Sequence, residues 1–290
     1  MRFIVGRMAG RQTLYLVRGD RAHDLSRHVP GATDLMALIA RPAALAGLDA
    51  GDLGEGIPLA DVEPALPVAR PPATICLGLN YVEHVKEGGY EVPDYPALFM
   101  RAPASLMPAG APMVRPSASP TLDYEAELMV VVGKGGRHIA ESDALGHVFG
   151  YTVFNDGSVR EYQRKTHQWT PGKNFDSTGA IGPVVVTPDE LPEGAAGLGI
   201  ESRVGGEVLQ SSNTANMIWG VAKAISIISG YTTLEPGTYI AMGTPPGVGH
   251  ARKPEPRWLR PGETVEVEIE RIGICASPVI DEDDARPPAG

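Results

Sequence analysis

Three acidic side chains stand close together in a stretch of sequence that is otherwise apolar. The segment LDYEAELMVV, residues 122–131, reads as a buried strand, yet it carries Glu125 and Glu127. Residues two apart in a strand point to the same side, so these carboxylates share one face, with Asp123 behind them. Carboxylates held so close repel each other unless a cation lies between them. The alternative is the ordinary acidic face of a solvent-exposed strand.

A further candidate ligand follows at the end of the next strand, where GYTVFN runs into Asn155-Asp156-Gly157. Strand ends are places where a rigid scaffold presents side chains to loops, although Asn-Asp-Gly is also a plain turn signal. Two Glu and one Asp give an all-oxygen ligand set, which suits Mg²⁺ or Mn²⁺ better than zinc. Because Mg²⁺ keeps several positions for water or substrate, three protein ligands are enough for a catalytic site.

A second group of ionisable residues occurs in GLNYVEHVKEGG, residues 78–89. His84 and Glu87 are three apart, so in a helical turn they share a face and can touch. A carboxylate beside an imidazole orients the ring and raises its basicity, which is what activation of a water molecule requires. The alternative is a charged helical turn exposed to solvent.

Two glycine-containing loops offer groups that can bind an anion. Lys173 lies in WTPGKNFDSTGAIGP, where its ammonium group can hold an anionic substrate or stabilise an oxyanion. In AMGTPPGVG, the Thr244 hydroxyl and the backbone amides can bind a carboxylate. The respective alternatives are an ordinary surface lysine and a tight turn.

The elements that must position these residues are many short strands and few helices. Helices are expected at residues 32–40 and 213–229, with Gly230 as a C-terminal stop, and RVGGEV contains the Gly-Gly loop of a tight hairpin. This pattern favours an α+β fold that is mostly β. The stretches that read as strands, each bounded by glycine or proline, are RFIVG, TLYLVRG, ATICLGL, ELMVVVG, VFGYTVFN, GPVVVTP, LGIESRVGGEVLQ, TYIAMG and TVEVEIERIG.

A proline-rich stretch, EPALPVARPPAT, predicts a linker between two parts of the chain. We expect a small N-terminal α/β domain over residues 1–70 and a main domain over residues 71–282. The tail DEDDARPPAG is acidic and rich in proline, and residues 283–290 are expected to be disordered.

Composition and charge exclude several classes of protein. A net charge of −10 argues against nucleic acid as the main partner, because phosphate backbones select basic surfaces. No apolar run approaches the ~20 residues needed to span a bilayer, and the N-terminus lacks a signal-peptide pattern, so a cytoplasmic location is expected. Cys76 and Cys275 lie far apart without a CxxC motif, which suggests neither a disulfide framework nor a zinc site.

Taken together and in this order, seven segments resemble the fumarylacetoacetate hydrolase family. They span roughly residues 75–280, whereas the N-terminal 70 residues match only in having the size of this family's variable small domain. The matching segments are GLNYVEHVKE, PALFMRAPASL, LDYEAELMVVVGK, GYTVFNDGSVREYQ, GKNFDSTGAIGP, YIAMGTPPGVG and PGETVEVEIERIGICASPV.

The resemblance implies a mixed β-sandwich roll, often assembled as a homodimer, that holds a divalent metal. It implies that Glu125, Glu127 and Asp156 are the metal ligands. Mg²⁺ is the usual ion, with Mn²⁺ or Ca²⁺ as alternatives, and hard cations of this kind take such carboxylate sets.

The same resemblance implies roles for the other candidate residues. His84 and Glu87 correspond to a water-activating dyad on a lid, and Lys173 corresponds to a lysine that binds substrate and stabilises an oxyanion. The pocket residues implied in this way are Tyr81, Arg101, Arg160, Gln163, Gly243 and Thr244.

Several positions depart from the pattern of many relatives. Gly157 and Glu161 replace a valine and an aspartate, Arg101 stands where a lysine is common, and Met242 stands where a threonine is common. These departures leave the metal ligands intact and put the substrate in doubt. Arg101 has two interpretations, a residue that holds a substrate carboxylate and a structural residue.

The implied activity is metal-dependent hydrolysis of a C–C bond in a 1,3-diketone or 2,4-dioxo acid of the acylpyruvate type, a small anionic substrate. Water activated by His84 and Glu87 attacks the distal carbonyl, and the departing enolate is stabilised by the metal. The alternatives are a decarboxylase, an isomerase or tautomerase, or a hydratase acting on a related keto acid in aromatic catabolism. A non-catalytic binder is a remote alternative, since no ligand or dyad residue is missing.

Overall fold

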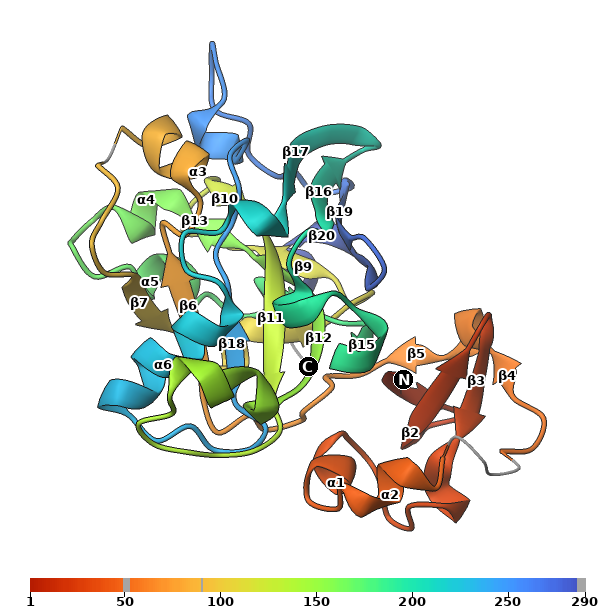
Figure 1. The fold of residues 1–290 in the computed structure, drawn as a ribbon. Coiled ribbons are helices and arrows are strands. Elements are labelled where there is room, and N and C mark those ends of the chain that lie inside the picture. Colours follow the sequence, from red (N-terminus) through yellow and green to blue (C-terminus); the bar gives the residue numbers. More distant parts are fainter. Residues whose placement is uncertain (49–52, 90, 286–290) are drawn as a thin grey trace.

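The computed structural model describes residues 1–48, 53–89 and 91–285. It confirms an α+β fold that is mostly β, with a large mixed sheet, a second sheet packed against it and short helices at the edges (Figure 1). In the described part of the chain, no helix is long and apolar enough to cross a membrane.

The N-terminal part is a small antiparallel sheet with two short helices beside it (Figure 1). Its first strand also pairs with β15, in the register Phe3↔Val185, so this sheet continues into the main one. The boundary near residue 70 therefore stays a prediction. The elements are β1 (Arg2–Met8), β2 (Arg11–Arg18), β3 (Arg21–Asp24), α1 (Met36–Ile39), α2 (Ala43–Ala46), β4 (Ile57–Pro58) and β5 (Glu63–Pro64).

The main part of the large sheet runs in the order β15-β12-β11-β18-β6-β7, with β14 and β8 attached beside β12. Its central strand β11 is buried on both faces, which explains its unbroken apolar run. Leu128 and Val130 face one core, whereas Met129 and Val131 face another beneath the N-terminal part. The strands are β6 (Thr74–Gly78), β7 (Ala97–Met100), β8 (Leu106–Pro108), β11 (Ala126–Val132), β12 (Val148–Asp156), β14 (Gly179–Ile181), β15 (Val184–Val186) and β18 (Tyr239–Ala241).

A second sheet, in the order β17-β16-β19-β20-β9, packs on β11 and β12 and completes a sandwich. The predicted hairpin between β16 and β17 is confirmed, and both loop residues, Gly205 and Gly206, have the positive φ that such a turn requires. Its strands are β9 (Met113–Arg115), β16 (Gly199–Val204), β17 (Glu207–Asn213), β19 (Thr264–Ile269) and β20 (Gly273–Asp281), while β10 (Leu122–Asp123) pairs separately with β13 (Ser158–Val159).

The helix expected over residues 213–229 is wrong at both ends. Residues 214–216 form a separate 3₁₀ turn, and the helix begins after Gly220 and runs past Gly230 to Tyr231. The expected disordered tail is also wrong in part, because its first residues lie in a short helix, while 286–290 lie outside the described residues. The helices of the main part are α3 (Val82–Glu87), α4 (Arg160–Gln163), α5 (Thr170–Lys173), α6 (Val221–Tyr231) and α7 (Glu282–Ala285).

Candidate active site

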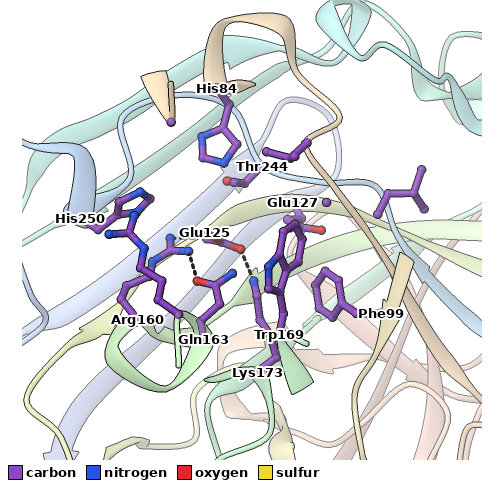
Figure 2. A pocket seen from close by; sticks show the side chains of 15 residues that line it. His84, Phe99, Glu125, Glu127, Arg160, Gln163, Trp169, Lys173, Thr244 and His250 are labelled. Atoms are coloured by element: carbon purple, nitrogen blue, oxygen red, sulfur yellow. Dashed lines mark hydrogen bonds and ion pairs between the residues drawn. The ribbon is translucent and has the colours of Figure 1, made fainter. Parts of the chain in front are cut away.

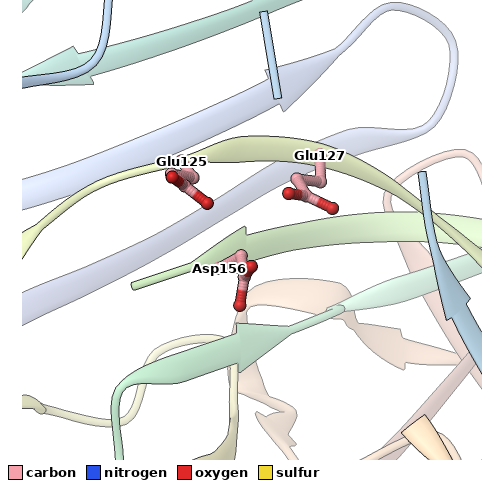
Figure 3. A group of neighbouring side chains, drawn as sticks. All are labelled: Glu125, Glu127 and Asp156. Atoms are coloured by element: carbon pink, nitrogen blue, oxygen red, sulfur yellow. The ribbon is translucent and has the colours of Figure 1, made fainter. Parts of the chain in front are cut away.

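The structure brings the three predicted carboxylates together at one end of the β11–β12 pair (Figure 3). Each of Glu125, Glu127 and Asp156 offers an oxygen, and these oxygens all lie within 4.8 Å of one another. All three residues are buried, so the alternative of a solvent-exposed acidic strand is wrong. Asp123 lies in β10, outside this cluster, and has a different role that is described below.

The antiparallel register of β11 and β12 explains why residues so far apart in the chain meet. Ala126 pairs with Asn155, which places the flanking glutamates beside the end of β12. The backbone N–H of Asp156 donates to the carbonyl of Glu125 at 2.9 Å, and the Asn155 side chain accepts from the N–H of Glu125 at 3.0 Å. Asn155 therefore holds the start of β11, a role that the sequence analysis missed.

Two of the three carboxylates are paired with buried basic groups. The Nζ atom of Lys173 lies 2.5 Å from Oε2 of Glu125 and 2.6 Å from Oδ2 of Asp156. Burial alone would lower the pKa of Lys173, but these two carboxylates raise it above its usual value, so the ammonium form is stabilised. Burial would likewise raise the pKa of Glu125, yet Arg160 and Lys173 hold it well below its usual value.

The third carboxylate, Glu127, makes no ion pair with a basic side chain of the described residues. Its hydrogen-bond partner is the backbone N–H of Gly243, at 2.8 Å. Burial, with Asp156 and Glu125 nearby, raises its pKa well above the usual value. A buried carboxylate without a cation is costly, and a divalent ion between the three oxygen donors would neutralise it, so the residues present fit Mg²⁺.

The two residues of the predicted dyad lie in contact on α3. Nδ1 of His84 lies 3.2 Å from Oε2 of Glu87, and the other oxygen of Glu87 accepts from the N–H of Gly247 at 2.9 Å. This contact ties α3 to the loop after β18. The His84 ring faces the carboxylates from across the pocket (Figure 2), which leaves its Nε2 atom for the reaction.

Asn80 anchors the segment that leads into α3. Its side-chain amide donates to the carbonyls of Trp219 and Met242, and its side-chain oxygen accepts from the N–H of Trp219. The preceding residue, Leu79, has a positive φ of 58°. A fully buried amide thus fixes the entry of the dyad helix to two other parts of the fold.

The loop after β18 contributes the predicted Thr244 to the pocket. Its hydroxyl oxygen accepts from the side-chain amide of Gln210 at 2.8 Å, and the side-chain oxygen of Gln210 accepts from the N–H of Ala126. The Thr244 hydroxyl hydrogen is therefore directed away from Gln210. Gln210 links this loop to the start of β11, another role that spacing along the chain does not reveal.

Arg160 and Gln163 both line the pocket, as predicted (Figure 2). The Arg160 guanidinium pairs with Asp123 and Glu125, each at 2.7 Å, and donates to the side-chain oxygen of Gln163 at 2.8 Å. Its main contacts are thus within the protein, where it positions Glu125. Because Gln163 uses its oxygen for this bond, its NH₂ group remains as a donor.

Three residues expected to touch substrate do not line the cavity, namely Arg101, Tyr81 and Gly243, whose N–H donates to Glu127. The Arg101 side chain is fully buried, pairs with Asp156 at 2.5 Å and donates to Thr178, which agrees with the structural interpretation. Tyr81 is also buried, and its hydroxyl has no hydrogen-bond partner among the described residues. Burial and the charge of Glu127 raise the pKa of Tyr81.

The opposite side of the pocket is an aromatic wall that the sequence analysis did not single out. The rings of Trp169 and Phe99 pack edge to face with centroids 5.6 Å apart, and Lys173 Nζ lies 4.9 Å from the centroid of Phe99. Trp169 lies directly against Gly78, where an added Cβ would come within 2.1 Å of the indole. The cavity is narrow, about 70 Å³, and its lining includes Leu77, Leu79, His84, Glu125, Glu127, Arg160, Gln163, Arg164, Trp169, Lys173, Thr244 and His250.

Comparisons with known proteins agree with this arrangement. The chain is 41% identical over 226 residues to human "Oxaloacetate tautomerase FAHD2A, mitochondrial", covering 77% of this chain and 71% of that protein. A solved structure of a putative HpcE protein from Mycobacterium smegmatis superposes with a TM-score of 0.88 at 31% identity, covering 98% of this chain and 100% of the other. Maleylpyruvate hydrolase from Sphingobium sp. SYK-6 superposes with a TM-score of 0.82 at 28% identity, covering 97% and 100%. Residues 73–280 match the family model "Fumarylacetoacetate (FAA) hydrolase C-terminal", and the chain belongs to the fumarylacetoacetate hydrolase family.

Proposed function

We propose that this protein is a metal-dependent tautomerase that interconverts the enol and keto forms of a small 2-oxo acid, with oxaloacetate as the first candidate. The observation that carries the proposal is the His84–Glu87 dyad facing a buried cluster of three carboxylates across a narrow cavity. The likeness to an oxaloacetate tautomerase supports the choice of substrate. Tautomerisation needs one group that moves a proton at carbon and an environment that stabilises an enolate.

The metal would be held by Glu125, Glu127 and Asp156, with Mg²⁺ as the first candidate ion. When bound, it supplies a Lewis acid that stabilises negative charge on the oxygens of a 2-oxo acid. Manganese and calcium ions are the alternatives to be tested beside magnesium.

The residues of the chain supply the proton transfer and the binding. The enol hydroxyl gives up its proton to solvent to form the enolate, and His84, oriented by Glu87, gives a proton from Nε2 to the carbon beside the carbonyl. His84 then regains a proton from solvent, and in the reverse direction the same group takes the proton from carbon. The Lys173 ammonium lies beside the carboxylate cluster, where it stabilises negative charge that develops on the carbonyl oxygen. The Thr244 hydroxyl donates to a substrate oxygen, and the aromatic wall excludes water.

The second candidate is hydrolysis of a C–C bond in an acylpyruvate, as expected from the family resemblance. The same dyad can activate water instead of moving a proton at carbon, and the likeness to maleylpyruvate hydrolase favours this reaction. Decarboxylation of oxaloacetate is a further outcome of the same enolate chemistry. A homodimer, a cytoplasmic location and a role in aromatic catabolism remain predictions.

Two assays separate these candidates. The first follows the decay of enol absorbance after enol-oxaloacetate is added, and the second detects pyruvate released from oxaloacetate and from a panel of acylpyruvates. Each is run with Mg²⁺, with EDTA and with the His84→Ala variant, beside a control variant at the exposed His28.

Enol decay that requires Mg²⁺ and His84, without pyruvate, supports the tautomerase. Pyruvate together with a free carboxylic acid from an acylpyruvate would replace it with the hydrolase. Pyruvate from oxaloacetate would indicate a decarboxylase.

A further inference from the structure

The basic side chains that line the pocket fall into two groups. Lys173 is paired with Glu125 and Asp156, and Arg160 is paired with Glu125 and Asp123. Both cations are paired with carboxylates of the protein at the end of the pocket where the carboxylate cluster lies. Besides His84 of the dyad, Arg164 and His250 remain, and both line the same cavity.

Arg164 follows directly after α4, one helical turn beyond Arg160. Its backbone N–H donates to the carbonyl of Arg160 at 3.1 Å, so the two arginines share one face of this turn. Within the described ranges, no carboxylate lies at ion-pair distance from the Arg164 guanidinium. An arginine fork that lines a cavity without a partner is suited to bind a carboxylate from solution.

His250 lies in the 3₁₀ turn η8 (Gly249–Ala251), and Asp123 positions that turn. The carboxylate of Asp123 accepts from the backbone N–H groups of Gly249 at 2.7 Å and of His250 at 3.0 Å.

The imidazole of His250 also has one ring nitrogen directed toward Asp123. Its Nδ1 atom is buried and lies 3.5 Å from Oδ2 of Asp123. A carboxylate beside Nδ1 favours the proton on that nitrogen, which leaves Nε2 for a ligand in the cavity. Figure 2 shows His250 and Arg160 on one side of the pocket, with Trp169 and Phe99 on the other.

The two sides of the pocket therefore differ in chemistry, one being aromatic and the other basic. Phe99 and Trp169 form an aromatic side, His250 and Arg160 lie on the other side (Figure 2), and Arg164 lines the same cavity one helical turn beyond Arg160. We propose that Arg164 and His250 bind the distal carboxylate of the substrate and thereby select short dicarboxylic 2-oxo acids over monocarboxylic ones. This inference rests on the proposed function for the reacting end of the substrate, which lies at the carboxylate cluster.

Binding of two unreactive acids tests the inference without any turnover. Malate and 2-hydroxybutanoate have the same four-carbon chain and the same 2-hydroxy acid group, but only malate has a second carboxylate. Their dissociation constants are measured by calorimetry in the presence of Mg²⁺. We expect the wild-type protein to bind malate at least about 10-fold more tightly, because a charge-assisted bidentate contact is added.

Substitutions test whether Arg164 and His250 cause the preference for malate over 2-hydroxybutanoate. Arg164→Gln and His250→Ala should each reduce the preference for malate, and the double variant should abolish it, while the affinities for 2-hydroxybutanoate and for Mg²⁺ stay within about twofold. Lys165→Gln is the matched control, because it removes a positive charge one residue away that pairs with Glu161 outside the cavity.

Three outcomes would overturn the inference: equal affinity of the wild type for the two acids, binding of neither acid, or a preference that survives in the double variant. Failure of the proposed function is distinguishable from these outcomes. A malate preference that depends on Arg164 and His250, in a protein that does not turn over enol-oxaloacetate, would sustain the binding site and reject the tautomerase.

Discussion

His84 and Glu87 form a pair in which the carboxylate has two tasks, since one oxygen lies 3.2 Å from Nδ1 of His84 and the other accepts from the N–H of Gly247. A Glu87→Gln substitution keeps an acceptor for Gly247 but places an NH₂ group against Nδ1. The imidazole would then carry its proton on the wrong nitrogen. We expect kcat to fall by about 100-fold or more, with KM little changed.

The control for this prediction is Glu83→Gln, on the same helix, where the side chain is exposed. Steady-state kinetics with enol-oxaloacetate, the proposed substrate, are measured for both variants. Equal kinetics of Glu87→Gln and the wild type would show that the dyad does not orient the catalytic imidazole.

Glu127 is a buried carboxyl group without a basic partner among the described residues, and its substitution should affect metal binding and stability in opposite directions. In Glu127→Gln the amide oxygen still accepts from Gly243, but the charge is gone. We expect Mg²⁺ affinity to fall by more than about 100-fold, because a direct ligand is weakened. The metal-free variant should be more stable than the metal-free wild type at neutral pH. The pKa of Glu127 is raised in the fold, so folding of the wild type must either take up a proton or leave a charge unpaired, and the neutral amide requires neither.

Calorimetric Mg²⁺ titration and urea unfolding with EDTA measure these two effects. Glu266→Gln on β19 is the control and should change neither quantity. Unchanged Mg²⁺ affinity in Glu127→Gln would contradict the assignment of this residue as a ligand.

Asn80 should contribute to the free energy of unfolding through its buried side-chain hydrogen bonds. An Asn80→Asp substitution turns a carboxylate oxygen toward the carbonyls of Trp219 and Met242, which now accept from the amide. Two buried carbonyls then lose their donor, so we expect a loss of roughly 2–4 kcal/mol in the free energy of unfolding. Urea denaturation measures it, with the exposed Asn216→Asp as control. A loss no larger than in the control would mean that these hydrogen bonds do not hold the segment.

Gly78 should be required because Trp169 occupies the space of a side chain. In Gly78→Ala the new Cβ would come within 2.1 Å of the indole, so the aromatic wall must shift. We expect kcat/KM to fall by about 10–100-fold, because the substrate is displaced from its aligned position. Gly146→Ala is the matched control, since a Cβ there meets no atom within 4 Å. Wild-type kinetics in Gly78→Ala would show that the wall does not position the substrate.

The residues that sequence analysis identified are those whose partners are near in the chain or belong to a family motif. Glu125 and Glu127 are two apart, and His84 and Glu87 are three apart, so local geometry predicts that each pair meets. The meeting of Glu127 with Asp156 depends on the register of β11 and β12, which the family resemblance supplied.

The structural roles that sequence analysis missed come from contacts between distant parts of the chain. Asp123 holds His250 and its turn, and Asn80 holds Trp219, each across more than a hundred residues. No spacing rule connects such residues before the fold is known.

The errors also have physical causes. The helix predicted from residue 213 begins only after Gly220, because the Asn213 side chain accepts from the N–H of Ala215 and closes a separate turn. Apolar periodicity alone does not detect this competing hydrogen bond. Arg101 lies behind Asp156 rather than in the pocket, which the sequence motif around it does not reveal.

The most direct test of the account is exchange of the C3 hydrogens of oxaloacetate with D₂O, followed by NMR. We expect that the protein with Mg²⁺ accelerates this exchange well above the rate of Mg²⁺ alone, and that EDTA or His84→Ala removes the acceleration. Because exchange reports proton transfer at carbon, it is independent of C–C cleavage. An exchange rate equal to that of Mg²⁺ alone, in protein shown by calorimetry to bind the metal, would contradict the account.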